Sequence, residues 1–291
     1  MDLVSIITVN FNGYKDTCAM IDSLKEWEFF SYEIIVVDNG SECNEGTLIK
    51  ESYPDITVIR SDKNLGFAGG NNLGLMNAKG NYILFLNNDI EINSPFLQFM
   101  VDSFKKDSSI GIVSPKIKYA FSRNIIQYAG FTPLSYVTLR NHIIGTGEQD
   151  KGQYDNPCYT AYAHGACMMT TRAILDEIGP MSEVFFLFYE ELDWSQRVKN
   201  AGYMIWYQPI AVIYHKEGMS IQKGTPLRNY YMVRGRLLYA RRNCIGLEWI
   251  LSCFYQSGLG LIRALKFLLL GDIEWASSYY RALRDGLFGE K

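Results

Sequence analysis

The first half of the chain alternates between short apolar runs and a helical pattern. Four runs rich in Val, Ile and Leu lie at residues 4–9, 33–37, 56–59 and 82–86, and the last is apolar at nearly every position. Such runs are typical of strands covered on both faces. Residues 14–27 have helical spacing between the first two runs. The alternation predicts an α/β fold with a mostly parallel sheet flanked by helices.

Polar residues follow three of these runs. Asn10 follows the first run, Asp38 the second, and Asn87, Asn88 and Asp89 the last. Because parallel strands end at the same edge of a sheet, these side chains are expected to gather there. Open α/β sheets bind ligands at that edge.

In the second half of the chain, the alternation of apolar runs and helical spacing is less regular. Residues 116–156 show no clear period and are expected to form loops and short strands over the polar edge. Further strands are expected at residues 162–170, 204–207 and 211–214, and helices at residues 190–201, from 227 onward and near 275–287. The expected division is therefore a domain at residues 1–226, with halves at about 1–115 and 116–226, and a helical extension at residues 227–291.

Charge and cysteine content exclude several classes of protein. The formal net charge of −3 argues against general nucleic-acid binding. The six cysteines have no zinc-site spacing. The first residues lack the basic segment of a signal peptide, so a reduced, cytoplasmic protein is expected.

The extension is basic and apolar. Residues 227–291 hold 10 Lys and Arg against 5 Asp and Glu. The longest uncharged run nearby, residues 249–262, is shorter than the roughly 20 residues that span a bilayer. Two interpretations stay open: peripheral contact with the inner face of the cell membrane, or a helical hairpin packed on the catalytic domain or across a homodimer.

Four groups of residues are candidates for chemistry. Asp38 is suited to binding a nucleobase or ribose, or to capping the next turn. The glycine-rich segment 64–74 precedes a helical pattern, as a phosphate-binding loop does. Its glycines could equally serve only to permit tight packing. Asp89 and His215 are candidate ligands for Mg²⁺ or Mn²⁺, with a structural histidine as the alternative.

The fourth group is acidic. Glu190, Glu191 and Asp193 follow an aromatic segment at the start of a predicted helix. Mutual repulsion and partial burial would raise the pKa of at least one, as a general base requires. Acids at a helix start also favour the helix dipole.

Together these motifs resemble family 2 glycosyltransferases of the GT-A fold, in their non-processive, rhamnosyltransferase-like branch. The resemblance covers roughly residues 3–245. The matching segments are residues 5–12, 36–41, 64–74, 86–89, 165–167, 186–194 and 215–220.

The resemblance implies an inverting enzyme that moves a sugar from a nucleoside diphosphate sugar to the hydroxyl of a saccharide or lipid-linked saccharide, in cell-surface polysaccharide or glycolipid assembly. Asp89 and His215 would hold Mg²⁺ or Mn²⁺, and Glu191 would be the general base, with Glu190 as the alternative. The residues implied for nucleotide-sugar binding are Thr8, Asn10, Asp38, Asn64, Gly66, Asn72, Asn88 and Asp89.

The chain departs from the family pattern at two positions. Asn87 stands at the first position of the acidic D-x-D motif, and Glu191 stands where the family usually has Asp. The Q-x-x-R-W motif of processive relatives is not found. Two alternatives stay open: a non-catalytic nucleotide-sugar-binding subunit and a sugar-phosphate nucleotidyltransferase.

Overall fold

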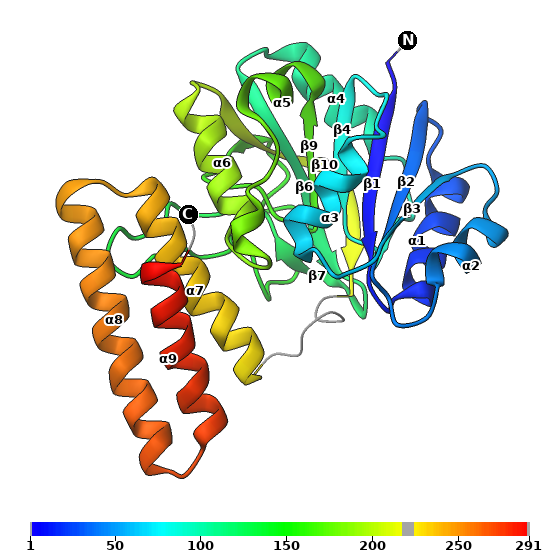
Figure 1. The fold of residues 1–291 in the computed structure, drawn as a ribbon. Helices are drawn as coiled ribbons and strands as arrows, with labels where there is room; N and C mark the ends of the chain where they lie inside the picture. Colours follow the sequence, from blue (N-terminus) through cyan, green and yellow to red (C-terminus); the bar gives the residue numbers. More distant parts are fainter. Residues whose placement is uncertain (1, 217–223, 290–291) are drawn as a thin grey trace.

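One mixed sheet forms the centre of the computed structural model, which describes residues 2–216 and 224–289 (Figure 1). The strands are β1 (Val4–Asn10), β2 (Tyr32–Asn39), β3 (Thr57–Ser61), β4 (Tyr82–Leu86), β5 (Ile90–Glu91), β6 (Ile110–Tyr119), β7 (Ser122–Tyr128), β8 (Cys158–Tyr159), β9 (Cys167–Thr171) and β10 (Met204–His215). The helices are α1 (Tyr14–Trp27), α2 (Glu45–Ser52), α3 (Gly66–Leu75), α4 (Leu97–Lys106), α5 (Arg172–Ile178), the short η1 (Glu183–Phe185), α6 (Glu190–Asn200), α7 (Pro226–Asn243), α8 (Gly246–Leu269) and α9 (Ile273–Phe288).

The strands run in the order β3-β2-β1-β4-β9-β6-β10-β5. β1 pairs in parallel with β2 and β4, and β6 with β10, whereas β9 is antiparallel to both of its neighbours. The predicted α/β fold with a mostly parallel sheet is therefore confirmed. Alternate residues of β1 feed two cores: Ile6 packs with α1, α2 and α4, and Ile7 with α3, α5 and α6.

The second half differs from the expected elements. The runs at residues 204–207 and 211–214 are one strand, β10, whose pairing with β6 shifts between Gln208↔Pro115 and Val212↔Lys116. Proline has no N–H to give to a ladder and is found in sheets at bulges, which accounts for the shift. Part of the segment expected as loops and short strands forms the end of β6 and all of β7. The strand expected at residues 162–170 is confined to β9.

A buried carboxylate joins α1 to α4. Glu28 is 5% exposed and directly follows α1. Its Oε1 accepts hydrogen bonds from the backbone N–H groups of Phe29 and Phe30, at 3.0 and 3.1 Å. Its Oε2 accepts from those of Phe96 and Leu97, at 2.9 and 3.1 Å. One side chain thus satisfies four N–H groups.

Replacing Glu28 by alanine should lower the free energy of unfolding by about 3 kcal/mol, because buried N–H groups would lose a charged acceptor. Urea denaturation measures this. The matched control is Glu26→Ala, since Glu26 is exposed two residues earlier on α1, and it should change stability by less than about 0.5 kcal/mol. Equal effects of the two substitutions would contradict the structural role of Glu28.

The last three helices stand side by side next to α6 (Figure 1). They share a core of their own that includes Val233, Leu237, Tyr279 and Leu283. α7 begins at Pro226, beside the expected domain boundary, and the division itself stays a prediction. Across the two described ranges, every helix is too short or too polar to cross a membrane.

Candidate active site

The polar strand ends meet at one edge of the sheet, as expected. Asn10 lies opposite Asp38 in the register of β1 and β2, and β4 on the other side of β1 ends directly before Asn87. Asn10 is fully buried. Its Oδ1 accepts from Thr17 Oγ1 at 2.7 Å, and its Nδ2 donates to Glu45 Oε2 at 2.8 Å. Asn10 therefore connects β1 to α1 and α2.

Two other predicted nucleotide ligands lie close to Asn10. Asn88 donates from Nδ2 to the same Thr17 hydroxyl at 3.0 Å. Thr8, also on β1, is fully buried, and its Oγ1 has no hydrogen-bond partner in the described part of the chain. Contacts of these side chains with a nucleotide stay predictions.

Asp38 has three partners within the chain. Its carboxylate accepts from the backbone N–H of Ser41 at 3.2 Å and of Gly46 at 2.9 Å. It also accepts from Arg60 Nη1 at 2.7 Å, and its side chain is 0% exposed, against 36% for Arg60. The structure thus gives Asp38 the capping role that the sequence left open. Its contact with a nucleobase stays a prediction, and Arg60 is the more accessible side chain at this position.

The glycine-rich segment docks on the loop before α6. Gly66 has φ +74°, and a Cβ there would lie 2.2 Å from the carbonyl oxygen of Phe186. That oxygen accepts from the N–H of Phe67 at 2.7 Å. Only glycine fits this position. Asn64 supports it, because Asn64 Oδ1 accepts from the Gly66 N–H at 2.8 Å.

Asn72 lies farther along α3. Its Nδ2 donates to the carbonyl of Met181 at 2.8 Å and to Glu183 Oε1 at 2.9 Å. The structure thus shows Asn72 bracing the segment between α5 and α6, and its contact with a nucleotide sugar stays a prediction.

The predicted metal ligands do come together. Asp89 follows β4 and His215 ends β10, and both are buried. Asp89 Oδ1 lies 3.1 Å from His215 Nε2. His215 Nδ1 lies 3.0 Å from Gln127 Oε1. The Gln127 carbonyl oxygen can accept a hydrogen bond from Nδ1, which would leave the Nε2 lone pair directed at Asp89.

This pair fits a divalent cation. Asp89 Oδ1 is buried and makes no hydrogen bond within the described residues, and an ion held between it and His215 Nε2 would satisfy both atoms. Ligands about 2.1 Å from an octahedral ion and at right angles to each other are about 3 Å apart. Across the described residues no group of three or more His, Cys, Asp or Glu side chains gathers. Water and phosphate oxygens would complete the shell.

The sequence reasoning missed two residues around this pair. Gln127 comes from β7, in a segment where no period was visible. The His164 ring centre is 6.2 Å from that of His215 and 5.9 Å from that of Phe131, on which it stacks. Burial, with a smaller contribution from His215, lowers the pKa of His164 to about 3, so the ring is neutral at pH 7. The signal available for His164 was its position next to Gly165 in a family-like segment.

The two glutamates lie at the first turn of α6. Tyr189 before them is left-handed, with φ +76°. Burial raises the pKa of Glu191 to about 7. Burial, and then the charge of Glu191, raises the pKa of Glu190 well above its ordinary value. Glu190 Oε2 is buried without a hydrogen-bond partner in the described ranges.

Glu191 lies next to the polar edge. A Cβ placed on Gly165 would be 3.7 Å from Glu191 Cγ. The neighbouring carbonyl of Ala166 accepts from the N–H of Asn87 at 2.9 Å. The strand end that leads to Asp89 therefore adjoins the loop on which Glu191 packs.

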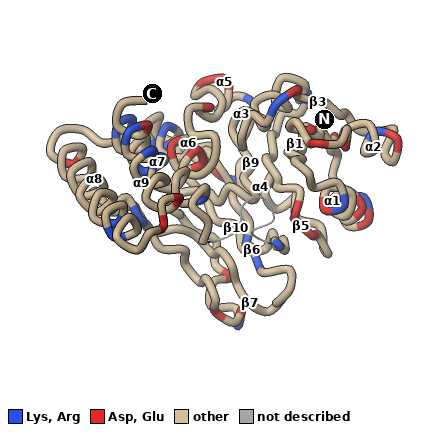
Figure 2. The backbone as a smooth tube through the Cα atoms, turned by 60° about the horizontal axis from the view of Figure 1, so that its bottom comes forward, with Lys and Arg blue, Asp and Glu red and all other residues tan. Residues whose placement is uncertain are grey.

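The carboxylate of Asp193 binds side chains of α7. It accepts from Arg242 Nε at 2.9 Å and from Asn243 Nδ2 at 2.8 Å. Figure 2 shows the acidic residues of α6 next to basic residues of α7. Arg236 of α7 also donates to the Tyr189 hydroxyl at 3.1 Å. The helix that carries both glutamates is thus held by α7. The remainder of the family-like segment after Lys216, residues 217–220, lies outside the described residues.

Several curated relatives with sequence similarity have the names of sugar-transferring enzymes. A low-salt glycan biosynthesis hexosyltransferase of Haloferax volcanii is 31% identical over 206 residues, which cover 69% of this chain and 62% of that protein. This chain therefore spans less than two thirds of that relative. A dTDP-rhamnosyl transferase of Shigella flexneri is 24% identical, over 97% of this chain and 95% of that protein.

Solved structures share the fold. GalNAc-T7 with UDP, GalNAc and Mn²⁺ has a TM-score of 0.69 and 16% identity, covering 99% of this chain and 56% of that chain. The mannosyltransferase PcManGT of Pyrobaculum calidifontis with GDP-Man and Mn²⁺ has a TM-score of 0.61 and 13% identity, covering 99% and 88%. Residues 5–179 match the sequence model of glycosyl transferase family 2, which is more than half of the chain. This chain belongs to glycosyl transferase family 2.

Proposed function

We propose that this protein transfers a sugar from a nucleoside diphosphate sugar to an acceptor hydroxyl, with inversion at the anomeric carbon. The observation that carries the proposal is the position of Glu191. Its carboxyl has a pKa of about 7, so it can take up a proton near neutral pH. It adjoins the strand end where Asp89 and His215 meet.

The reaction is a single displacement. The acceptor oxygen attacks the anomeric carbon and forms the new glycosidic bond. The bond from that carbon to the diphosphate oxygen breaks, and the diphosphate leaves with the electron pair. Glu191 takes the proton of the acceptor hydroxyl as attack proceeds, because a protonated hydroxyl is a poor nucleophile. Burial of Glu190 beside it keeps Glu191 as the more accessible base.

Asp89 and His215 would hold Mg²⁺ or Mn²⁺. Such an ion supplies a Lewis acid that stabilises negative charge on a departing diphosphate. Two observations support this assignment: the 3.1 Å approach of Asp89 Oδ1 to His215 Nε2, and the Mn²⁺ named in both structures of similar fold. The residues themselves select neither metal, because a carboxylate oxygen is a ligand that both Mg²⁺ and Mn²⁺ accept.

The relatives' names suggest the substrate class. One is named a hexosyltransferase of glycan biosynthesis and another a dTDP-rhamnosyl transferase. We infer a hexose or deoxyhexose donor, and a saccharide or lipid-linked saccharide acceptor in cell-surface glycan assembly.

A donor screen tests the proposal. The protein is incubated with UDP-, dTDP- and GDP-sugars, with Mn²⁺, Mg²⁺ or EDTA, and the nucleoside diphosphate released is measured. We expect slow, metal-dependent hydrolysis of one donor and faster release when a saccharide acceptor is added. Release of a nucleoside triphosphate on adding pyrophosphate would identify a nucleotidyltransferase instead. Tight donor binding without any turnover would identify a non-catalytic binding subunit.

A further inference from the structure

The helix α8 packs Cys253, Ala264 and Phe267 against the core that it shares with α7 and α9, and leaves most of its large apolar side chains exposed to solvent. Its buried residues are Ser252, Gln256 and Gly260, and Gly260 packs against Leu283 of α9. Ten large apolar side chains of α8 are 44% to 82% exposed, and six of them follow one line along the helix: Leu247, Leu251, Phe254, Leu261, Leu265 and Leu268. We call these six residues and Gly258 the α8 stripe. Contiguous exposed apolar side chains along a helix of 24 residues mark an interaction surface.

The spacing of the α8 stripe is that of a coiled-coil seam. Its seven positions follow one another at intervals of four, three, four, three, four and three residues. This 3.5-residue repeat places side chains where one helix packs along another. Gly258 is the middle position of the seven. A Cβ there would meet no described atom within 4 Å, so a second backbone can approach closely.

The stripe is also symmetric about Gly258. Leu251 lies seven positions before it and Leu265 seven positions after it. Two copies of α8 that cross antiparallel at Gly258 therefore bring leucine level with leucine on both sides. An interface of this kind is isologous, since each copy uses the same surface.

The charges beside the stripe are complementary in the same arrangement. Glu248 and Lys266 are 18 residues apart, which is five turns of about 3.6 residues, so both stand on one edge of α8. Glu248 lies ten positions before Gly258 and Lys266 eight positions after it. In the antiparallel pair, each Glu248 is within about 3 Å along the axis of Lys266 of the partner subunit. Neither side chain has an ion-pair partner among the described residues.

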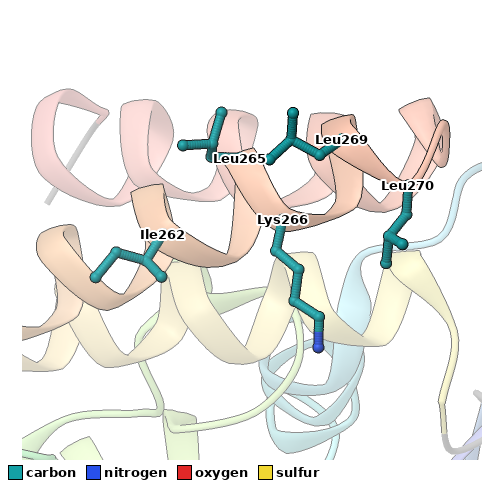
Figure 3. Close-up of a pocket in the computed structure, with 5 residues that line it drawn as sticks. All are labelled: Ile262, Leu265, Lys266, Leu269 and Leu270. Carbon is teal, nitrogen blue, oxygen red and sulfur yellow. The ribbon is translucent and has the colours of Figure 1, made fainter.

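An apolar hollow lies at the end of the same face. Ile262, Leu265, Lys266, Leu269 and Leu270 line it. Figure 3 shows Leu265 and Leu269 pointing to one side of α8 and Lys266 to the other. Leu269 is eleven positions after Gly258 and Leu247 eleven before it, so the antiparallel crossing brings Leu247 of the partner subunit to this hollow.

We propose that α8 is a homodimer interface, in which two copies of this chain pack antiparallel across Gly258. The competing occupant is an anionic membrane surface, which would favour a basic border. The border formed by Glu248 and Lys266 has no net charge. In the antiparallel pair, each of these side chains lies near its opposite charge on the partner subunit. The proposal is independent of the catalytic assignment.

Light scattering after size exclusion tests the proposal, at several concentrations of the full chain. We expect a mass of twice 33.3 kDa for the natural sequence. Glu248→Lys and Lys266→Glu should each weaken dimerisation about tenfold, through like-charge contacts. The double variant should restore it. Glu274→Lys, on an exposed residue of α9, is the control and should dimerise normally.

Two outcomes would overturn the proposal. The first is a dimer that persists in Leu251→Glu, a variant whose fold is checked by circular dichroism, because the interface would then lie elsewhere. The second is a monomer at all concentrations that sediments with vesicles containing phosphatidylglycerol. In that case Glu248→Lys should strengthen sedimentation, opposite to its expected effect on a dimer.

Discussion

Replacing Glu191 by glutamine should lower the rate of sugar transfer about a thousandfold, while the affinity for the nucleoside diphosphate changes less than about twofold. Glutamine keeps the shape of the side chain beside Gly165 but cannot take up the acceptor proton. Turnover at saturating substrate measures the first quantity, and titration calorimetry the second. A loss of binding equal to the loss of turnover would show that Glu191 supports the site rather than the proton transfer.

The same assignment sets a pH dependence. The base acts only when its carboxyl is ionised, so transfer by the natural sequence should rise as the pH increases through about 7 and then level off. The residual transfer by Glu191→Gln should lack this step.

Glu190→Gln is the matched control for the base. Glu190 is the more buried of the two, and burial together with the charge of Glu191 raises the pKa of Glu190 well above its ordinary value, which favours its neutral form. Glutamine resembles that neutral form, so transfer should stay within about tenfold of the natural rate. If Glu190→Gln lowers the rate of sugar transfer about a thousandfold and Glu191→Gln does not, Glu190 is the base and the assignment to Glu191 is wrong.

Replacing Asp89 by asparagine should abolish stimulation by Mn²⁺ and lower transfer about a thousandfold. The amide is nearly isosteric, but it has no negative charge to oppose the ion. Mn²⁺ binding in the presence of a nucleoside diphosphate, followed by electron paramagnetic resonance, provides a readout that does not depend on turnover. Unchanged Mn²⁺ binding would place the ion elsewhere.

Asn87→Asp is the matched variant for the metal site. It supplies the carboxylate that this chain lacks at the first position of the acidic motif. We therefore expect it to tighten Mn²⁺ binding while Asp89→Asn weakens it.

The polar edge of the sheet is predictable from the sequence because it depends on local pattern alone. An apolar run followed by Asn or Asp predicts a strand end, and parallel strands bring such ends together. The pairing of Asp89 with His215, which are 126 positions apart, is not local. The chemistry of the two residues made them candidate ligands, and the resemblance to a family supported their pairing.

Other features depend on tertiary contacts that no local pattern carries. Gln127 reaches His215 from a strand with no visible period. Asn72 contacts Met181 and Glu183, which follow it by more than a hundred positions. The apolar character of α8 is plain in the sequence, but which face meets α9 depends on where Gly260 permits close packing.

The shift in β10 has a consequence for His215. Between Gln208 and Val212 the strand advances four residues while β6 advances one, from Pro115 to Lys116. Side chains alternate between the two faces of a sheet, so an odd number of extra residues exchanges the faces. The face of the sheet to which the His215 side chain points therefore depends on the number of residues in this bulge. Homologues that gain or lose a single residue there would keep both proposed metal ligands in an alignment and yet turn the imidazole away from Asp89.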